Sequence, residues 1–512
     1  MEKFYITTAI AYVNAEPHIG FALELLQADV LARYHRLNDD NVYFLTGTDE
    51  HGTKVAEAAK KAGKEPKDFV DDIAKKYIKL AEALNISNND FIRTSDKVRH
   101  WPTAIKIWNK LLENGDLYKK DYEGLYCTGH EAFIKKSELI DGPPSPNGFG
   151  RASQCSVHKT EPQIVKEENW FFRLSKYKDE IRKKIEDDEL KIVPTSRKNE
   201  IVNLLKDAED VSFSRPIESL KWGIPVPNDP TQTMYVWTDA LTNYISALGY
   251  DKDDAKFKDF WPADVHLIGK DILRFHAMIW PGILLACGIP LPKAIYVHGF
   301  ITVDDEKMSK SLGNVIDPFE LIDKYGVDAV RYFLLREIPS DEDGDFSYKK
   351  IEDRYNGELA NGLGNLVQRV ATLIDDKLDG ELIHNDASFD KELKNNDNLR
   401  DFFDDKKFDD YISDFKLHEA LGNHISSKIS FANKFIDLNK PWAIVNSDPE
   451  RFIIVMNILV LMIHNISWLL YPFIPQTCEK IFETFGVGGK KEIEDRFKCL
   501  IKKGQGLFPR IS

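Results

Sequence analysis

The stretch FYITTAIAYVNAEPHIGFALELLQADVLARYHRLNDDNVYFLT, residues 4–46, decides the fold because it alternates strand-forming and helix-forming patterns. Phe4–Ile10 and Val42–Thr46 are rich in β-branched and aromatic residues, as buried strands are. Between them, Phe21–Leu37 repeats apolar residues at helical spacing: Leu23, Leu26, Val30, Tyr34 and Leu37. A second helical pattern follows at Thr53–Ala62. This order predicts βαβ units whose helices pack on a parallel sheet.

The strand rhythm stops between about Gly115 and Pro227, where glycine, proline and charged residues cluster, as in GPPSPNGFGRASQCSVHKTEP. It resumes with predicted parallel strands at Met234–Trp237, Asp264–Ile268 and Ala294–Val303, the last two separated by an apolar helix near Ile272–Cys287. From about Ile351 helical periodicity dominates, with a weak acidic linker near Asp375–Asp397. We therefore expect an α/β fold: a Rossmann-type parallel-sheet domain in two halves, 1–115 and 228–350, split by an inserted domain, 116–227, and followed by an α-helical bundle, 351–512.

The composition is that of a folded, enzyme-sized protein. At 512 residues the chain exceeds the ~250–300 residues at which single cores stop growing, so several domains are expected. A net charge of −14 argues against a protein that binds nucleic acid over its whole surface, so any RNA contact must be local. Five cysteines without a secretory signal indicate a reducing cytoplasm, where they are thiols or metal ligands.

Residues 452–478 contain no Asp, Glu, Lys or Arg, which on that ground alone suggests a membrane span. Polar residues and two prolines interrupt the segment, the polar ones being Asn457, His464, Asn465 and Ser467. We therefore expect a buried helix that ends at Pro472, and no membrane partner.

Two short motifs follow predicted strands. Pro17-His18-Ile19-Gly20 comes after the first strand, and Lys307-Met308-Ser309-Lys310-Ser311 after the last. Strand ends are where α/β folds bind ligands, and the helix N-terminus beside Gly20 offers N–H groups to phosphates. His18 can donate to a phosphate oxygen, and the two lysines, in a mobile loop, can close over a triphosphate. The alternative for the lysine motif is an ordinary solvated loop.

These motifs resemble the signature sequences of class I aminoacyl-tRNA synthetases, and the sequence between them resembles methionyl-tRNA synthetases. The resemblance runs from Phe4 to about Phe473 and rests on FYITTAIAYVNAEPHIG, YFLTGTDEHGT, YVWTDALTNY, HLIGKDILRFHAMIWP, VHGFITVDDEKMSKSLGN and NKPW. It implies an enzyme that activates methionine with ATP as methionyl-adenylate and transfers it to the 3′ end of tRNA(Met). Mg²⁺ would neutralise the phosphates, and no covalent nucleophile is needed. The helical bundle would bind the anticodon.

The resemblance also assigns residues. Asp49 would bind the α-amino group of methionine, helped by the backbone around Ile10, and the side-chain pocket would comprise Tyr12, Trp237, Ala240, Leu241, Tyr244, Phe275 and His276. For each aromatic residue alone, the alternative is core packing. ATP would be bound by Pro17, His18, Gly20, Lys270, Asp271, His298, Gly299, Lys307, Met308, Ser309, Lys310 and Ser311, with His18, Gly20, Lys307 and Lys310 as catalytic residues. Asp271 could equally be an N-cap before Ile272.

One residue departs from the family pattern. The first motif usually ends in a second histidine, and here position 21 is Phe. Phe21 cannot donate a hydrogen bond to a phosphate, and one lost donor at a comparable site costs ~2.7–4 kcal/mol in the transition state. We expect ATP activation that is reduced or compensated elsewhere.

The predicted insertion contains two Cys-x-x-His pairs, Cys127 with His130 and Cys155 with His158. Four such ligands suit tetrahedral Zn²⁺. Family members carry zinc in this segment, often with Cys where His130 stands. The alternative is that Cys127 lies in a buried strand beside Tyr126 while both histidines are solvated.

The helical region carries Asn361, Asn365 and Arg369 at four-residue steps, and Pro441-Trp442 further on. Such a stripe is ordinarily a polar helix face. Anticodon bases are read by hydrogen bonds and aromatic stacking. By resemblance Asn365 and Arg369 would read the anticodon and Trp442 would stack on its first base.

Two other functions remain open at this point. One is a different enzyme on the same nucleotide fold, a nucleotidylyltransferase or a synthetase for another amino acid. The other is a catalytically impaired tRNA-binding paralogue, for which Phe21 is the direct hint. The chain stops soon after the helical region, without the appended OB-fold that makes some relatives dimers, so we expect a monomer.

Overall fold

The computed structural model describes residues 2–127, 132–134, 136, 139–144, 151–156, 159–308, 313–383, 386–486, 498–500 and 506–511. The chain divides into two compact units, each built from separate segments. The first, here called the sheet unit, comprises Met1–Glu16, Asn41–Lys79 and Asn88–Val297. The second, the helical unit, comprises Pro17–Asp40, Leu80–Ser87 and His298–Ser512.

A seven-stranded sheet forms the centre of the sheet unit, in the order β10-β15-β14-β1-β3-β2 with β4 also paired to β3. β1 (Lys3–Thr8) pairs in parallel with β3 (Asn41–Asp49) and β14 (Val265–Gly269), and β3 pairs in parallel with β2 (Ala11–Tyr12) and β4 (Asp90–Arg93). β10 (Lys191–Val193) is parallel to β15 (Ala294–His298). The near-continuous burial of β3, β14 and β15 is typical of a sheet covered on both faces. The predicted parallel-sheet α/β fold is confirmed.

The apolar residues of helices in this unit lie on one face, and those of α4 pack on strand residues of the sheet. α4 (Trp101–Glu113) buries Thr103, Ala104, Ile107, Trp108 and Leu111, which recur at three- and four-residue steps. α2 (Thr53–Lys61) buries Val55 and Ala59 in the same way. α3 (Pro66–Ala83) follows α2.

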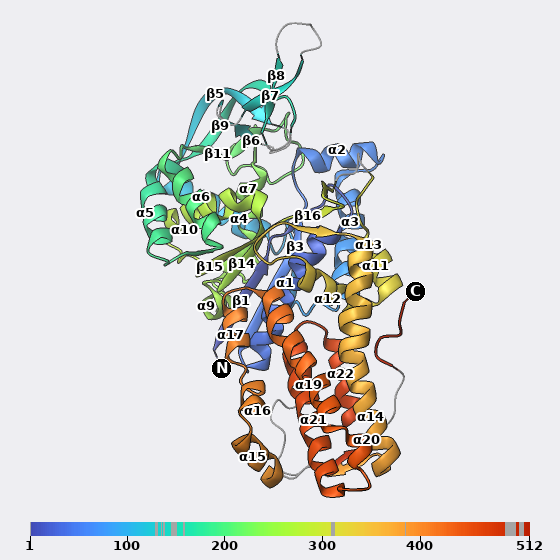
Figure 1. Ribbon diagram of the computed structural model, residues 1–512. Helices are drawn as coiled ribbons and strands as arrows, with labels where there is room; N and C mark the ends of the chain where they lie inside the picture. The colour runs from blue at the N-terminus through green and yellow to red at the C-terminus, as the bar shows by residue number, and fades with distance from the viewer. Residues whose placement is uncertain are drawn as a thin grey trace. The chain divides into compact units, whose positions relative to one another are not determined.

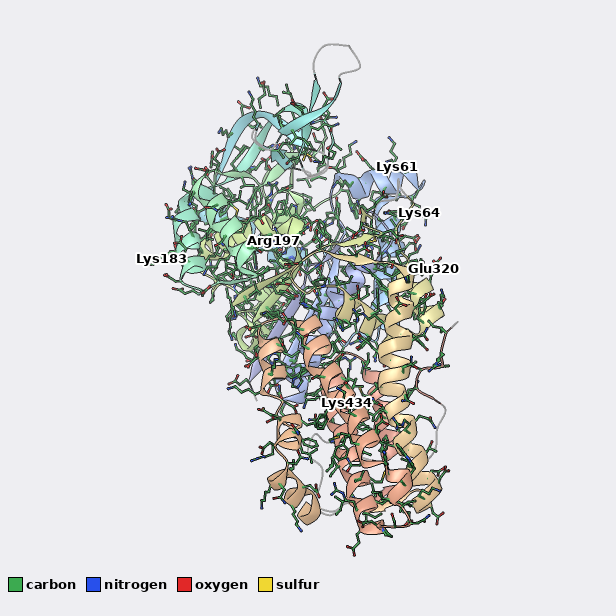
Figure 2. All side chains as sticks on the ribbon, in the orientation of Figure 1. Lys61, Lys64, Lys183, Arg197, Glu320 and Lys434 are labelled. Atoms are coloured by element: carbon green, nitrogen blue, oxygen red, sulfur yellow. The ribbon has the colours of Figure 1, made fainter. Side chains whose placement is uncertain are left out.

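Antiparallel pairing interrupts the parallel order after α4. β5 (Leu117–Cys127) pairs with β9 (Gln163–Phe172) along ten residues, side by side in Figure 1, and the sheet order is β11-β9-β5-β6. β6 is Ala132–Ile134 and β11 is Val211–Ser212. A hairpin of β7 (Leu139–Pro144) and β8 (Arg151–Cys155) precedes β9. The helices α5 (Leu174–Glu186) and α6 (Thr195–Lys206) follow, and Lys183 and Arg197 mark them in Figure 2.

Two sequence predictions in this region were wrong. Met234–Trp237 is no parallel strand, because β13 (Gln232–Met234) pairs antiparallel with β12 (Ser214–Pro216) and α7 begins at Val236. Ala294–Val303 is two strands, since β16 (Ile301–Val303) belongs to a small sheet with β17 (Glu306–Lys307) and β18 (Gly344–Phe346). Short apolar runs carry too few residues for their period to separate helix from strand.

The helical unit contains a bundle in which α14 (Asn365–Leu378), α19 (Ser426–Asn439), α21 (Pro449–Leu470) and α22 (Pro475–Phe485) pack on one another (Figure 1). Lys434, labelled in Figure 2, marks α19. The unit also contains α1 (Ile19–Leu37), α11 (Pro318–Tyr325), α12 (Val327–Glu337), α13 (Tyr348–Arg354), α17 (Lys406–Ser413) and α20 (Pro441–Ile444). The predicted helical bundle is confirmed.

α21 is the one helix in the described part of the chain that is long and apolar enough to cross a membrane. Its most apolar window is 78% buried among the other helices, as in the core helix of a bundle. The predicted buried helix is confirmed, although it ends at Leu470 rather than at Pro472. The predicted acidic linker is structured over much of its length, because it contains the end of α14, β19 (Glu381–Ile383) and α15 (Asp386–Asn395).

Candidate functional site

The amino-acid side of the candidate site begins where β3 ends. Asp49 is the last residue of β3 and is buried, and it lies opposite Tyr12 in the β2–β3 register. The N–H of Val13 donates to the Asp49 carbonyl at 3.1 Å. The fold therefore places Asp49 beside Tyr12, two residues that the family resemblance assigned to the methionine site.

Aromatic side chains from two helical segments form a wall in the same unit. Trp237 lies on α7 (Val236–Ala240), and Phe275 and His276 begin a π-helical turn, Phe275–Ile279. The Trp237 and Phe275 rings are stacked, with centroids 4.0 Å apart and planes 6° apart. The His276 ring meets Trp237 edge-on at 5.9 Å. Ala240, Leu241 and Tyr244 follow on the same chain segment and are buried.

Hydrogen bonds fix the tautomer of His276. Its Nδ1 lies 3.0 Å from the Ile272 carbonyl, which can only accept, so Nδ1 carries the proton. Its Nε2 therefore accepts from the Tyr244 hydroxyl at 2.7 Å. Burial lowers the pKa of His276 to about 4, so the ring is neutral at physiological pH. The wall thus presents no charge to a bound apolar side chain.

A cavity of about 830 Å³ in the sheet unit is lined partly by Phe275 and by its neighbour Arg274. Arg215 and Tyr235 also line it, with the guanidinium 4.7 Å from the centre of the Tyr235 ring. Arg215 is 5% exposed, and its Nη1 donates to Ser212 Oγ and to the Ser214 carbonyl. Arg215 was not predicted from the sequence, because a single arginine in a three-residue strand carries no local signal.

Three further buried polar residues were also missed. Asp239 on α7 lies 2.5 Å from His51 and 2.7 Å from His100. His51 and Asp239 belong to TDEHGT and YVWTDALTNY, which carried the family resemblance, whereas His100 lies in neither motif. Spacing along the chain does not pair His51 with Asp239, because they are 188 positions apart.

Lys270 and Asp271 lie in a short 3₁₀ turn, Lys270–Ile272, directly after β14. The alternative role of Asp271 as an N-cap was wrong, because Gly269 occupies the cap position and Asp271 lies inside the turn. Asp271 is exposed and Lys270 is half-buried. Both side chains are therefore accessible at the carboxyl end of a parallel strand, where ligands bind in such sheets.

In the helical unit, His18 caps the N-terminus of α1. The Gly20 N–H donates to His18 Nδ1 at 3.1 Å, so in the neutral ring the proton lies on Nε2. His18 is exposed. A Cβ at Gly20 would lie 2.9 Å from His18 Cε1, so a side chain there would displace the ring.

The second motif approaches the first within this unit. The position of a Cβ on Gly20 is 3.9 Å from Met308 Cε, and the Ile19 N–H donates to the Ile316 carbonyl at 3.4 Å. Lys307 ends β17, a strand of the small sheet rather than of the large parallel one. Ser309, Lys310 and Ser311 lie outside the described residues.

His298 is the last residue of β15, and Gly299 follows it, two residues before β16. His298 Nδ1 lies 2.7 Å from the Gly299 carbonyl, and its Nε2 lies 3.1 Å from a Glu24 carboxylate oxygen on α1. Any side chain at Gly299 would collide with the backbone of Glu342. The glycine is therefore required by a close approach of two chain segments.

Only part of the predicted zinc set lies among the described residues, since His130 and His158 fall outside them. Cys127 and Cys155 are fully buried and pack together with Ile134. Thr160 lies beside both, with its hydroxyl 3.6 Å from Cys127 Sγ and its carbonyl 2.9 Å from the Cys155 nitrogen. No group of three or more potential ligands occurs in the part of the chain that the structure describes. The two thiols fit a zinc site as one half of a ligand set.

Of the predicted anticodon residues, Arg369 and Trp442 lie beside each other. Arg369 lies 5.8 Å from the centre of the Trp442 ring and also pairs with Asp437 at 2.6 Å. Trp442, on α20, is 47% exposed, which is unusual for so large an apolar side chain. Asn365 is exposed at the start of α14, whereas the Asn361 side chain accepts a hydrogen bond from Arg510 at 2.6 Å.

Comparisons with known proteins agree with this architecture. The family model "tRNA synthetases class I (M)" matches residues 4–371, and "Anticodon-binding domain of tRNA ligase" matches residues 405–499. The methionine–tRNA ligase of Brucella suis is 42% identical over 524 residues, covering 99% of this chain and 98% of the relative. That of Thermotoga maritima is 42% identical over 521 residues, covering 99% of this chain and 80% of the relative.

Solved structures give the same result. Mycobacterium tuberculosis methionyl-tRNA synthetase in complex with methionyl-adenylate superposes with a TM-score of 0.91 at 37% identity, covering 100% of both chains. Its apo form superposes with a TM-score of 0.83 at 34% identity, covering 100% of this chain and 99% of the other. Because the identity extends through both units, the chain belongs to the methionine–tRNA ligases, within the class I tRNA synthetases.

Proposed function

We propose that this chain activates methionine with ATP to give methionyl-adenylate and then transfers the methionyl group to the 3′ end of tRNA(Met), in the cytoplasm. The observation that carries the proposal is the uncharged aromatic wall of Trp237, Phe275 and neutral His276, in the unit that also holds Asp49. An amino acid with a flexible apolar thioether needs such a wall, together with a carboxylate for its ammonium group. The methionyl-adenylate complex of the mycobacterial relative supports the same substrate.

In the proposed methionine site, the Asp49 carboxylate accepts hydrogen bonds from the substrate ammonium, and the backbone at Ile10 assists. The thioether lies against Tyr12, Trp237 and Phe275, where sulfur–aromatic contacts contribute ~0.3–1.5 kcal/mol each. Ala240, Leu241 and Tyr244 complete the pocket, and Tyr244 holds His276 in one tautomer. Leucine and valine would fill the pocket less completely.

In the proposed ATP site, the His18 Nε2–H and the N-terminus of α1 donate to phosphate oxygens, and Gly20 permits close approach. Lys307 and Lys310 neutralise the charge that develops on the phosphates, and Pro17, Met308, Ser309 and Ser311 shape the two motifs. Lys270, Asp271, His298 and Gly299 bind the ribose and adenine. Mg²⁺, when bound, neutralises the triphosphate and the departing pyrophosphate.

The reaction then needs only positioning and charge stabilisation. A methionine carboxylate oxygen attacks the α-phosphorus of ATP, and pyrophosphate leaves with the bonding electron pair. A hydroxyl of the terminal tRNA ribose next attacks the carbonyl carbon of the adenylate, and AMP leaves. No protein side chain is required as a base in the first step.

The domain roles are part of the same proposal. Residues 1–115 and 228–350 form the catalytic domain, 116–227 the inserted domain with Zn²⁺ held by Cys127, His130, Cys155 and His158, and 351–512 the anticodon-binding domain. Asn361, Asn365, Arg369 and Trp442 face the anticodon, and the protein is a monomer without a membrane partner. Metal analysis finding no stoichiometric zinc would remove the metal site, and sedimentation showing a stable dimer would refute the monomer.

The decisive experiment is methionine-dependent exchange of pyrophosphate into ATP without tRNA, with leucine, valine and cysteine as controls. We expect exchange with methionine alone. Exchange with another amino acid would overturn the pocket assignment. If folded protein exchanged with none of them, the chain would instead be an impaired tRNA-binding paralogue, and Phe21 would be the first residue to test.

A further inference from the structure

A buried carboxylate joins two segments of the sheet unit that the proposed methionine site uses. Asp239 is 1% exposed, and its two oxygens are shared between two histidines. Oδ2 lies 2.5 Å from His51 Nδ1, and Oδ1 lies 2.7 Å from His100 Nε2. An ionised carboxylate only accepts hydrogen bonds, so both of these histidine nitrogens carry protons.

The Asp239 carboxylate is ionised near neutral pH. Burial raises its pKa, but His51 and His100 together lower it by more, so its pKa lies below the usual range. His100 Nδ1 lies 2.9 Å from Ser246 Oγ, which continues the hydrogen-bonded chain. Both histidines are as buried as the carboxylate, so this network is shielded from water.

The positions of these residues along the chain show which parts of the proposed methionine site the network connects. His51 follows Asp49 by two residues, and Asp239 follows Trp237 by two residues. One hydrogen bond therefore connects the turn that follows the proposed ammonium ligand at the end of β3 with the helix that carries Trp237 of the proposed aromatic wall.

Ring contacts and further hydrogen bonds also restrain the turn that contains His51. The His51 ring lies edge-on between Trp101, at 6.0 Å, and Trp222, at 5.3 Å. Trp222 Nε1–H donates to the Glu50 carbonyl at 2.5 Å, and the Gly52 N–H donates to the Trp222 carbonyl at 3.1 Å. The Glu50 carboxylate is held by Arg93 Nε at 2.6 Å. A displacement of His51 would therefore move the turn as a whole.

We propose that Asp239 is a positioning residue for methionine: through His51 it keeps the Asp49 carboxylate at a fixed separation from the Trp237–Phe275 wall. The inference rests on the proposed function, because it uses the roles given there to Asp49 and Trp237. A substrate bound at both its ammonium group and its thioether needs the Asp49 carboxylate and the aromatic wall at the correct distance from each other. Small misplacements of such anchors are expensive in catalysis.

The test compares Asp239→Asn with Asp116→Asn in the exchange assay. Asp116 is a matched control, because it too is a buried carboxylate and accepts from two side chains, Lys176 at 2.7 Å and Tyr177 at 2.8 Å. For Asp239→Asn we expect the KM for methionine to rise about tenfold, as expected for the loss of a hydrogen bond to a charged group, while the KM for ATP changes less than about twofold. Asp116→Asn should leave both KM values unchanged.

A second variant, His51→Gln, keeps the Asp239–His100 bond and tests the link to the turn alone, should Asp239→Asn fail to fold. We expect it to raise the KM for methionine in the same direction, and the double variant should be no worse than Asp239→Asn. An unchanged methionine KM in either folded single variant would overturn the inference, as would an equal rise in Asp116→Asn. If the unaltered protein showed no methionine-dependent exchange, the proposed function itself would be refuted. That result differs from an unchanged methionine KM in a variant, which would refute only the role of Asp239.

Discussion

A histidine on the wall of the methionine pocket keeps one protonation state across the working pH range. His276 donates from Nδ1 to a backbone carbonyl and accepts at Nε2 from Tyr244, whose own carbonyl accepts from the Tyr5 hydroxyl at 2.7 Å. Protonation would place a second proton on Nε2 and create a buried charge, which is costly. Burial accordingly lowers the pKa of His276 to about 4. The pocket is therefore polar in its hydrogen bonding but uncharged.

This protonation state predicts a pH dependence of stability. The folded pKa of His276 is about 4 and the unfolded value about 6.5, so the unfolded chain binds the proton more readily. The neutral His276 ring therefore contributes to the free energy of unfolding in full above pH 6.5. This contribution, up to roughly 3 kcal/mol, is lost as the pH falls toward 4. Gln at this position can make the same two hydrogen bonds without titrating. The thermal midpoint of His276→Gln should therefore fall less between pH 7 and pH 5 than that of the unaltered protein, and parallel curves would contradict the assignment.

Phe21 predicts a gain of activity on substitution. Its N–H bonds the His18 carbonyl at 3.0 Å, so the residue lies in the first turn of α1 beside the proposed phosphate site. Phe21→His would restore a side-chain donor there, and we expect the rate of adenylate formation to rise about tenfold or more. Phe21→Leu is the control and should give no gain. Unchanged exchange in Phe21→His would mean that another donor already replaces the missing histidine.

At the scale of elements, the α1 N-terminus shows how the first motif works as a unit. The cap bond from Gly20 to His18 fixes the imidazole and selects the tautomer whose proton lies on Nε2. The same helix end leaves backbone N–H groups for phosphates. The cap is thus part of the proposed chemistry and not only of the helix.

A prediction at this scale concerns Trp442 in the bundle. Trp442 is exposed on α20, a four-residue helix, and Arg369 on α14 lies against its ring. Base–aromatic stacking is worth ~1–3 kcal/mol per base, so Trp442→Ala should raise the KM for tRNA about tenfold or more. Exchange without tRNA should be unchanged, because the bundle does not contribute to the proposed methionine pocket. Equal losses in charging and in exchange would refute the anticodon role of Trp442.

Local patterns predicted the elements better than they predicted the pairing of elements. α1 was expected at Phe21–Leu37 and begins two residues earlier, at Ile19, because amphipathic spacing and a cap are local signals. Met234–Trp237 was expected as a strand and splits between β13 and α7, since four apolar residues fit either period. The family resemblance assigned Trp237 and Phe275 to one pocket but did not predict that their rings stack. It did not predict the Asp239 network either, because the partners of Asp239 are joined only by the tertiary fold.

At the scale of the whole molecule, one arginine holds together three separate segments of the helical unit. Arg331 on α12 is fully buried, and its Nη2 pairs with Asp29 on α1 at 2.7 Å. Its Nη1 donates to the Leu84 carbonyl at 2.9 Å, and its Nε to the Phe473 carbonyl at 2.7 Å. The ion pair joins residues 302 positions apart, so no local sequence pattern could reveal it.

Removal of this arginine should therefore destabilise the helical unit as a whole. Arg331→Met leaves the buried Asp29 carboxylate with its Arg33 ion pair and its Ser87 hydrogen bonds, and it removes the donor to three backbone carbonyls. By analogy with other broken buried pairs this costs about 3–5 kcal/mol. We expect the thermal midpoint, followed by circular dichroism of the helices, to fall by roughly 10 °C. Lys324→Met is the control, because its partner Glu352 and the lysine are 40% and 56% exposed and such pairs contribute about 0–1 kcal/mol. Equal midpoints for the two variants would show that the buried pair does not join the three segments energetically.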